Sequence, residues 1–172
     1  SMPEEHNRVL TDHCSDLLVC PTQTAVENLA KEGLTRGIFL VGDPMYDAVM
    51  WFDQRAQQRP SILQRLGLEQ GNYLLATVHR AYNTDDPARL GAILHTLFAQ
   101  GEEVIFPLHP RTRQKIQEYR LLEGKRGKLH LIEPLGYLDM LQLEKNARCI
   151  LTDSGGIQKE AYFFAVPCLT LR

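Results

Sequence analysis

Short, continuous runs of apolar residues alternate with helical patterns over the last two-thirds of the chain. The apolar runs lie at 73–78, 103–107, 129–133, 149–152 and 167–171. The helical patterns lie between them, at 86–100, 112–122, 137–147 and 156–165. Strands that are apolar on both faces are typical of a parallel sheet covered by helices on both sides. The pattern therefore predicts a doubly wound α/β domain whose strands have the order 3-2-1-4-5.

The first third of the chain has the same alternation on a smaller scale. Its helical patterns and apolar strands follow one another at 3–13, 16–20, 24–33, 38–41 and 45–58. Pro21 ends the first strand, and Thr22 or Thr24 can cap the helix that follows. Two parallel strands bury too little apolar surface to be stable alone. We therefore expect residues 1–58 to be the end of a truncated domain and residues 59–172 to form a second domain.

Composition and charge exclude several classes of protein. With 44% hydrophobic and 23% charged residues, the chain is typical of a globular fold. Its net charge of −2 gives no overall positive field that would attract nucleic acid or an anionic membrane. No apolar run approaches the ~20 residues of a membrane helix, and the N-terminal residues lack the pattern of a signal peptide. Cys20, Cys149 and Cys168 lie in apolar runs and are predicted to be buried thiols of a cytoplasmic protein.

Two loops of the second domain are dense in groups that bind anions. Doubly wound sheets bind ligands at the carboxyl ends of the strands where the strand order switches, here between the first and fourth strands of the domain. The loops that follow these strands are 79–83 and 153–156. Ser154, Gly155 and Gly156 begin a helix, and the glycines let a ligand approach amides that carry partial positive charge. The Ser154 hydroxyl can either cap this helix or contact a phosphate.

Further candidate ligands flank these loops. His79 and Arg80 end the first strand, where they can bind a phosphate or move a proton, or simply cap the strand. Glu160 can accept hydrogen bonds from two vicinal ribose hydroxyls, or be an ordinary solvated glutamate. Segment 109–113 adds cations, and segment 134–137 can hold a base edge through its backbone. Because no pair of carboxylates is arranged to hold Mg²⁺, we predict metal-free binding of a nucleoside diphosphate.

Taken together, these motifs resemble those of the non-hydrolysing UDP-N-acetylglucosamine 2-epimerase family. The stretches that carry the resemblance are PEEHNRVLTDHCSDLLVCPTQTAVENL, VGDPMYDAV, ATVHRAYNTDD, FPLHPRTR, EPLGYLDMLQLEKNA and TDSGGIQKEAYFFAVPCLTLR. They cover essentially the whole chain in order, and the TDSGG block is the most specific. The resemblance implies two Rossmann-like domains of glycosyltransferase-B type with the active site between them.

The resemblance also implies a reaction and roles for single residues. The family removes the C2 proton of the UDP-sugar, expels UDP and adds it back after reprotonation on the opposite face, without a metal or nicotinamide cofactor. By resemblance, His79 contacts the phosphate and assists the leaving group, and Glu4 or its neighbour Glu5 is an acid/base carboxylate. The predicted substrate-binding residues are Arg80, Leu135, Met140, Ser154, Gly155, Gly156 and Glu160.

Three positions depart from the family pattern. Tyr82 stands where a glutamate is common, Lys159 where an acidic residue is common, and Asp43 where asparagine is common. The stretches GDPMYDA, LHPRTR and QKEAYFF are closer to epimerases of UDP-2,3-diacetamido-glucuronic acid, in which Arg111 would meet the sugar carboxylate. Both UDP-N-acetylglucosamine and this sugar are therefore open as substrates.

The resemblance implies that the catalytic machinery is not complete in this chain. The family's first nucleotide-sugar half would precede residue 3, and relatives continue beyond Arg172. We therefore expect the parent protein, a homodimer, to be the epimerase and these 172 residues alone to be inactive. The alternatives are a UDP-sugar glycosyltransferase of the same fold and a non-catalytic UDP-sugar-binding module. Only an epimerase would form the manno epimer from UDP-N-acetylglucosamine without an acceptor.

Overall fold

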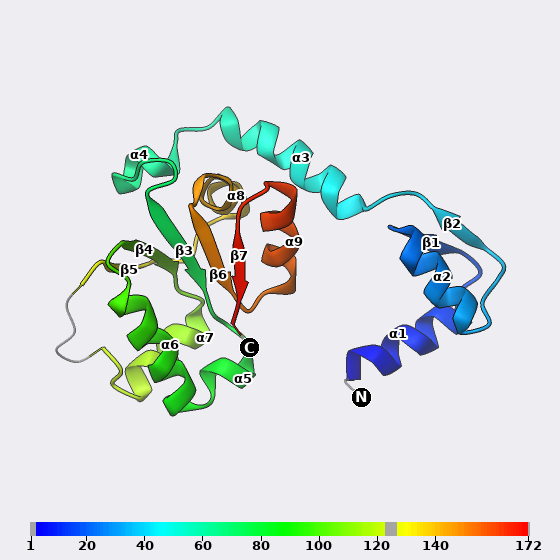
Figure 1. The fold of residues 1–172 in the computed structure, drawn as a ribbon, viewed down its shortest axis with the longest axis horizontal. Coiled ribbons are helices and arrows are strands. Elements are labelled where there is room, and N and C mark those ends of the chain that lie inside the picture. The colour runs from blue at the N-terminus through cyan, green and yellow to red at the C-terminus, as the bar shows by residue number, and fades with distance from the viewer. Residues whose placement is uncertain (1–2, 123–126, 172) are drawn as a thin grey trace. The chain divides into compact units, whose positions relative to one another are not determined.

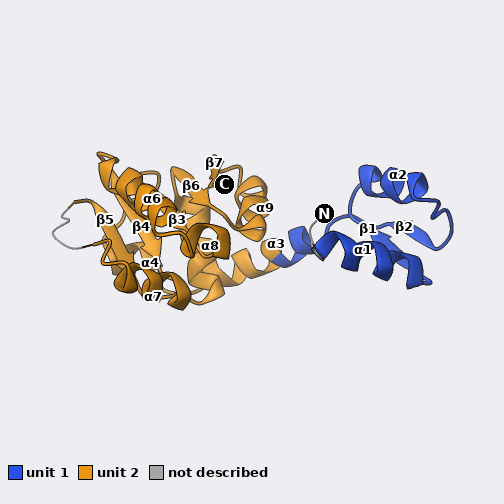
Figure 2. Ribbon diagram, turned by 90° about the horizontal axis from the view of Figure 1, so that it is seen from below, with its two compact units in different colours: residues 1–48 blue, residues 49–172 orange. Residues whose placement is uncertain are grey.

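In the computed structural model, which describes residues 3–122 and 127–171, the chain divides into two compact units. Unit 1 covers residues 1–48 and unit 2 covers residues 49–172 (Figure 2). Helix α3 (Pro44–Gln57) crosses the division, so its first residues belong to unit 1 and the rest to unit 2. Among the described residues, no helix combines the length and the apolar character that crossing a membrane requires.

Unit 1 is built around a small parallel sheet. Before α3 it contains α1 (Pro3–Cys14), β1 (Leu18–Cys20), α2 (Gln23–Lys31) and β2 (Ile38–Leu40). The two strands are parallel, and Leu18 lies opposite Ile38. Buried side chains from β1 and α2 form its core, while Val19 and Phe39 are exposed. The apolar core of this unit is therefore small, as the two predicted strands indicated.

Local signals determine two of the turns in unit 1. The Thr22 side chain accepts a hydrogen bond from the Ala25 amide, so Thr22 rather than Thr24 caps α2. Gly37 has a φ of +68°, and a Cβ atom at this position would overlap the Asp16 carbonyl oxygen. The Gly37 carbonyl also accepts from the Leu18 amide at 2.7 Å, which aligns β1 with β2. Only glycine fits this turn without strain.

Unit 2 contains one sheet of five parallel strands. The strands are β3 (Tyr73–Thr77), β4 (Glu103–Pro107), β5 (Leu129–Ile132), β6 (Cys149–Thr152) and β7 (Cys168–Thr170). Their order across the sheet is β5-β4-β3-β6-β7 (Figure 1). This is the order 3-2-1-4-5 within the unit, which confirms the doubly wound α/β fold. The strand order therefore switches between β3 and β6, the point at which such sheets bind ligands.

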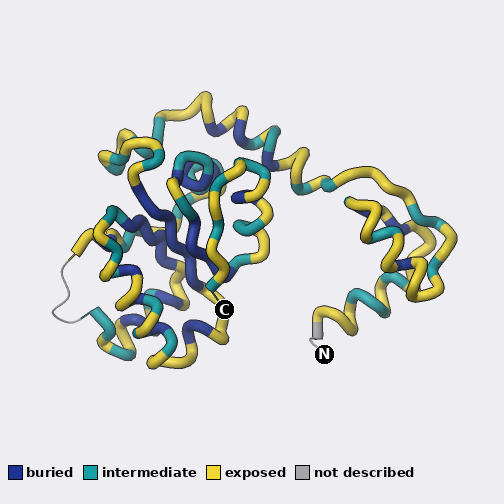
Figure 3. The backbone as a smooth tube through the Cα atoms, in the orientation of Figure 1, coloured by how far each residue is buried: buried dark blue, intermediate teal, exposed yellow. Residues whose placement is uncertain are grey.

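Helices cover both faces of this sheet. They are α4 (Ile62–Leu66), α5 (Ala81–Thr84), α6 (Pro87–Ala99), α7 (Pro110–Glu118), α8 (Tyr137–Asn146) and α9 (Gly155–Phe163). Helices α6 and α7 pack on the face that carries Leu74 and Phe106, and α4, α8 and α9 pack on the face that carries Leu75 and Ile150. Every residue of β3 is buried, which Figure 3 shows as dark blue along the strand. Burial on both faces explains why this strand is a continuous apolar run.

Some details of unit 2 differ from the sequence-based prediction. The short helices α4 and α5 were not predicted, because five and four residues are too few to show a periodic apolar pattern. Helix α7 begins two residues early, where Pro110 occupies the first turn, and ends before Arg120, which has a φ of 52°. Cys20 is buried as predicted, but Cys149, at the start of β6, and Cys168, on the edge strand β7, are only half-buried.

Candidate functional site

The two loops with anion-binding groups meet at the carboxyl edge of the sheet in unit 2. Strands β3 and β6 are neighbours, with Thr77 opposite Thr152, and the hydroxyls of these two threonines are 2.6 Å apart. The Asp153 amide continues the ladder by donating to the Thr77 carbonyl at 3.3 Å. Loop 79–83 and loop 153–156 therefore leave the sheet side by side, as the strand order requires.

Asp153 joins these loops, and its role was not predicted from the sequence. Its carboxylate is buried and accepts from the amides of His79 and Arg80, at 3.1 and 2.9 Å, and from the Asn83 side chain at 2.9 Å. The Nδ1 atom of His79 also lies 3.1 Å from this carboxylate. With Nδ1 bound to Asp153, the Nε2 atom of His79 is the ring nitrogen that can face a ligand. The sequence feature that could have indicated this role is an ionisable residue directly after the apolar strand 149–152.

Arg80 and the N-terminus of α9 present positive charge to one place. The Arg80 guanidinium lies 3.9 Å from the position that a Cβ atom would take at Gly155. Ser154 is the N-cap of α9, and its hydroxyl accepts from the Ile157 amide at 3.4 Å. The cap leaves the amides of Gly155 and Gly156, in the first turn, directed away from the helix. A cation beside a helix N-terminus is the arrangement that binds phosphate groups.

A pocket of about 380 Å³ lies beside this edge, beyond the carboxyl ends of β3, β4 and β5. It is lined by His79 and His109, whose ring centroids are 6.0 Å apart, and by Leu135 and Met140. The structure therefore brings three of the predicted site residues, His79, Leu135 and Met140, to one cavity. Its volume and its mixture of apolar side chains and imidazoles suit a small planar group.

Glu160 lies one turn into α9 and is almost completely buried, with an exposed fraction of 6%. It accepts a hydrogen bond from the Tyr137 hydroxyl at 2.8 Å. Burial, followed by the interaction with Glu160, raises the pKa of Tyr137 above its ordinary value. The alternative interpretation of Glu160 as a solvated helix glutamate is therefore wrong. A buried carboxylate with a fixed donor is positioned for specific hydrogen bonds.

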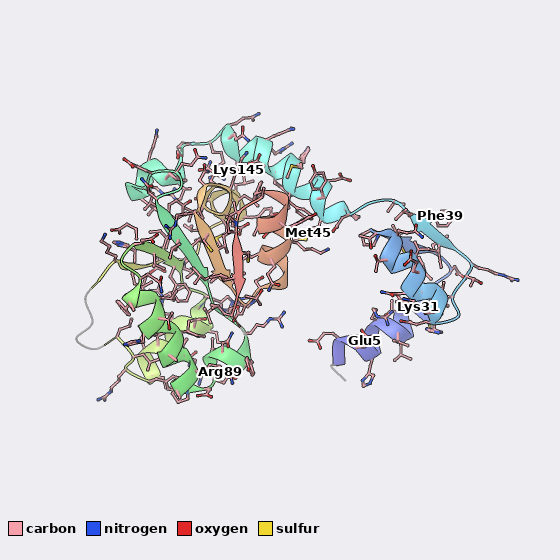
Figure 4. The ribbon with its side chains drawn as sticks, in the orientation of Figure 1. Glu5, Lys31, Phe39, Met45, Arg89 and Lys145 are labelled. Atoms are coloured by element: carbon pink, nitrogen blue, oxygen red, sulfur yellow. The ribbon has the colours of Figure 1, made fainter. Side chains whose placement is uncertain are left out.

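Glu4 belongs to unit 1, whereas all the other candidates belong to unit 2. It is exposed, in the first turn of α1, and Glu5 beside it is bound by Arg8 at 2.7 Å (Glu5 is labelled in Figure 4). The Arg8 guanidinium lowers the pKa of Glu5, which makes this carboxylate a weaker base. Arg8 also binds Asp12 and Glu32, and these four side chains line a pocket of about 710 Å³ in unit 1.

The donor set favours an anionic ligand over a metal ion. Within the described residues, no group of three or more His, Cys, Asp and Glu side chains could hold a metal. The groups that converge on the loops are instead amides, a guanidinium and imidazoles, which donate to phosphate oxygens. Chemically, the site can bind a phosphorylated ligand with a flat substituent and can transfer a proton through His79.

The chain matches a known protein family over its whole length. The family model described as UDP-N-acetylglucosamine 2-epimerase matches residues 1–172. A UDP-N-acetylglucosamine 2-epimerase homolog of Methanococcus maripaludis is 52% identical over 99% of this chain and 49% of its own length. A UDP-2,3-diacetamido-2,3-dideoxy-D-glucuronate 2-epimerase of Pseudomonas aeruginosa is 46% identical over 99% of this chain and 48% of its own length. The chain therefore spans about half the length of the curated relatives it matches.

A solved structure agrees with the fold. The Methanocaldococcus jannaschii UDP-GlcNAc 2-epimerase, crystallised with UDP-GlcNAc and UDP, superposes with a TM-score of 0.85 and 43% identity. The match covers 99% of this chain and 49% of that one. At this identity the likeness extends to both sequence and fold, and it includes the sheet that carries the candidate site.

Proposed function

Because the chain belongs to the UDP-N-acetylglucosamine 2-epimerase family, we propose that the whole protein inverts C2 of a UDP-2-acetamido sugar and that unit 2 holds the UDP. The observation that carries this proposal is the pair of loops joined by Asp153, which sets His79 and Arg80 beside the N-terminus of α9. In domain terms, residues 59–172 would be the UDP-binding Rossmann-like domain of a glycosyltransferase-B-type fold, and residues 1–58 the end of the first domain.

The positions of these donors indicate how UDP would bind. The diphosphate would lie against the amides of Gly155 and Gly156 and the Arg80 guanidinium, since both present positive charge to the same place. The uracil would enter the pocket beside Leu135 and Met140, and the Glu160 carboxylate would accept from the ribose hydroxyls. The Ser154 hydroxyl is used as the helix cap, so its contribution to binding is to hold the two glycines in place. All these contacts form without a metal ion.

The chemical steps require a proton donor at the leaving group and a base at C2. UDP leaves with the electrons of its bond to the sugar as the C2 proton is removed, and the reverse addition follows delivery of a proton to the opposite face. His79, with Nδ1 bound by Asp153, would use Nε2 to donate to the departing phosphate. Glu4 would be one carboxylate of the acid/base set. Glu5 is the weaker candidate because Arg8 binds its carboxylate and lowers its pKa.

A second substrate is supported by the resemblance to the diacetamido-glucuronate epimerase of Pseudomonas. That sugar carries a carboxylate, for which Arg111 was the predicted partner. In the structure the Arg111 guanidinium is bound by both oxygens of Asp85, at 2.6 and 2.8 Å. Asp85 engages only the Nη2 atom, in an exposed ion pair, so the Nε and Nη1 donors of Arg111 can still meet a sugar carboxylate and both sugars stay open as substrates.

A chimera tests the proposal. Residues 3–171 replace the matching half of the Methanocaldococcus jannaschii enzyme, and the product is incubated with UDP-N-acetylglucosamine in D₂O without an acceptor. The expected result is deuterium at C2 and formation of the manno epimer, both observed by NMR. Replacing His79 by alanine should reduce the rate at least about 100-fold, within the range for a general acid. Tyr162→Ala, at an 82% exposed position, is the control and should have no effect.

Two outcomes of this experiment would change the proposal. A folded chimera that binds UDP but exchanges no C2 proton, with either UDP-N-acetylglucosamine or the diacetamido-glucuronate sugar, would support the non-catalytic binding module instead. Activity with the second sugar alone would identify the diacetamido-glucuronate sugar as the substrate. We propose the nucleotide sugar, UDP and a second copy of the protein as partners, which the family resemblance supports. We propose the cytoplasm as the location, which the predicted buried thiols support.

A further inference from the structure

Glu144 is a buried acid that the proposed reaction does not use. It lies on α8 with no exposed surface, and neither of its oxygens meets a hydrogen-bond donor among the residues that the structure describes. An ionised carboxylate in such a place would lose its hydration without compensation. The group that faces it is the carboxyl of Glu160 on α9. Burial, followed by the charge of Glu160, raises the pKa of Glu144 to about 9, so it holds a proton at neutral pH.

Burial and Glu160 are the causes that raise the pKa of Glu144, and no cation is among them. The other titratable groups that face Glu144 are Tyr137 on α8 and Cys168 on β7, and both are neutral near pH 7. Lys145, next in the chain and labelled in Figure 4, is bound by Asp53 of α3 at 2.7 Å. The proton on Glu144 is therefore what keeps the two carboxyl groups at a single negative charge. A protonated carboxyl group is also an O–H donor, and Glu160 is the acceptor beside it.

The Glu160 carboxylate keeps some of its acceptor positions for a ligand. An ionised carboxylate has about four positions that accept hydrogen bonds. The Tyr137 hydroxyl takes one on Glu160, and the Glu144 hydroxyl would take a second. About two remain, which is the number that two neighbouring hydroxyls of a ligand require.

We propose that Glu144 is a positioning residue, a protonated carboxylic acid that donates to Glu160 and, with Tyr137, holds its carboxylate for two vicinal hydroxyls of the ligand. The inference rests on the proposed function, in which Glu160 binds the ribose. It adds a dependence on pH. When the pH rises through the pKa of Glu144, at about 9, the donor is lost and two buried carboxylates repel each other. Binding of the ribose should weaken over that interval.

The experiment compares UDP with 2′-deoxy-UDP, which lacks one ribose hydroxyl, by calorimetry at pH 7.5 and at pH 9.5. Glu144→Gln keeps a donor but cannot ionise, and Glu144→Leu removes the donor while filling the space. At pH 7.5 the wild type and Glu144→Gln should bind UDP more tightly than 2′-deoxy-UDP. In Glu144→Leu the ratio of the two affinities should be about five- to tenfold smaller, which is the effect of one hydrogen bond. At pH 9.5 the wild type should lose the preference and Glu144→Gln should keep it. Glu118→Gln, a surface change, is the control.

The outcomes separate the inference from the proposed function. If Glu160→Gln removes the preference for UDP but Glu144→Leu does not, Glu160 binds the ribose without the help of Glu144 and the inference is overturned. If Glu160→Gln also leaves the preference intact, or if the wild type binds no UDP, the role of Glu160 in the proposed function fails with it. A merely structural role of Glu144 would weaken both ligands equally, and that result would also contradict the inference.

Discussion

Replacing Asp153 by alanine should release the two loops that form the candidate site. The carboxylate is 3% exposed and accepts from the amides of His79 and Arg80 and from the Asn83 side chain. In the alanine variant these donors lose a charged acceptor, and the buried Asn83 side chain has the least access to water in its place. The His79 ring also loses the group that fixes Nδ1.

The expected magnitude follows from these contacts. Each buried donor left without a partner costs about 1–3 kcal/mol. His79 and Arg80 are themselves exposed, so water partly replaces the acceptor, and the sum should be about 3–5 kcal/mol rather than the maximum for three donors. For a chain of this length, each kcal/mol lowers the unfolding temperature by about 2–4 °C, which predicts a decrease of about 10 °C.

Urea and thermal unfolding followed by circular dichroism measure this stability, and calorimetry with UDP measures the site. The affinity for UDP should decrease at least about tenfold. The reason is that a displaced His79 or Arg80 side chain no longer donates one charge-assisted hydrogen bond to the phosphate. Asp85→Ala is the matched control, since that carboxylate forms an exposed ion pair with Arg111. A stability change below about 1 kcal/mol with unchanged UDP affinity would refute the role assigned to Asp153.

Three further predictions concern other parts of the chain. Because the folded state binds a proton at Glu144 that the unfolded state releases above pH 4.5, stability should fall as the pH rises from about 4.5 to about 9. Urea unfolding at pH 6 and pH 8 should show this slope, up to about 1.4 kcal/mol per pH unit, and Glu144→Gln should flatten it. Gly37→Ala should disrupt unit 1, seen as faster amide exchange in β1 and β2, whereas Gly33→Ala, where a Cβ meets no atom within 4 Å, should cost only about 1 kcal/mol. The 172-residue chain alone should incorporate no deuterium at C2 of UDP-N-acetylglucosamine, and exchange near the rate of a full-length relative would contradict the assignment of catalysis to both domains.

The strands and their order were predictable because of how they are buried. A strand covered on both faces, such as β3, must be apolar at every position, so it appears in the sequence as a continuous run. Topological rules then restrict the order in which such strands pair. The same order places loops 79–83 and 153–156 together. Position in the sheet, rather than any single motif, was thus the informative signal.

The partners of buried polar residues were not predictable in the same way. Asp153 could be seen as the first residue of its loop, but its donors Arg80 and Asn83 lie 73 and 70 positions earlier in the chain. For α8 the sequence predicted only a helical pattern over 137–147. The structure buries four consecutive residues, from Leu141 to Glu144, because this helix is enclosed by neighbours on several sides. A pattern with a period of 3.6 residues cannot reveal that Glu144 is among them.

The most direct test of the UDP site is a titration of the isotope-labelled chain with UDP in the presence of EDTA, followed by amide NMR. We predict saturable binding whose largest shifts are at the amides of Gly155 and Gly156 and in the loop that begins at His79, and adding Mg²⁺ after removal of EDTA should leave the affinity unchanged. Binding that requires Mg²⁺, or shifts confined to residues of unit 1, would contradict the assignment of the UDP site to the edge where β3 meets β6.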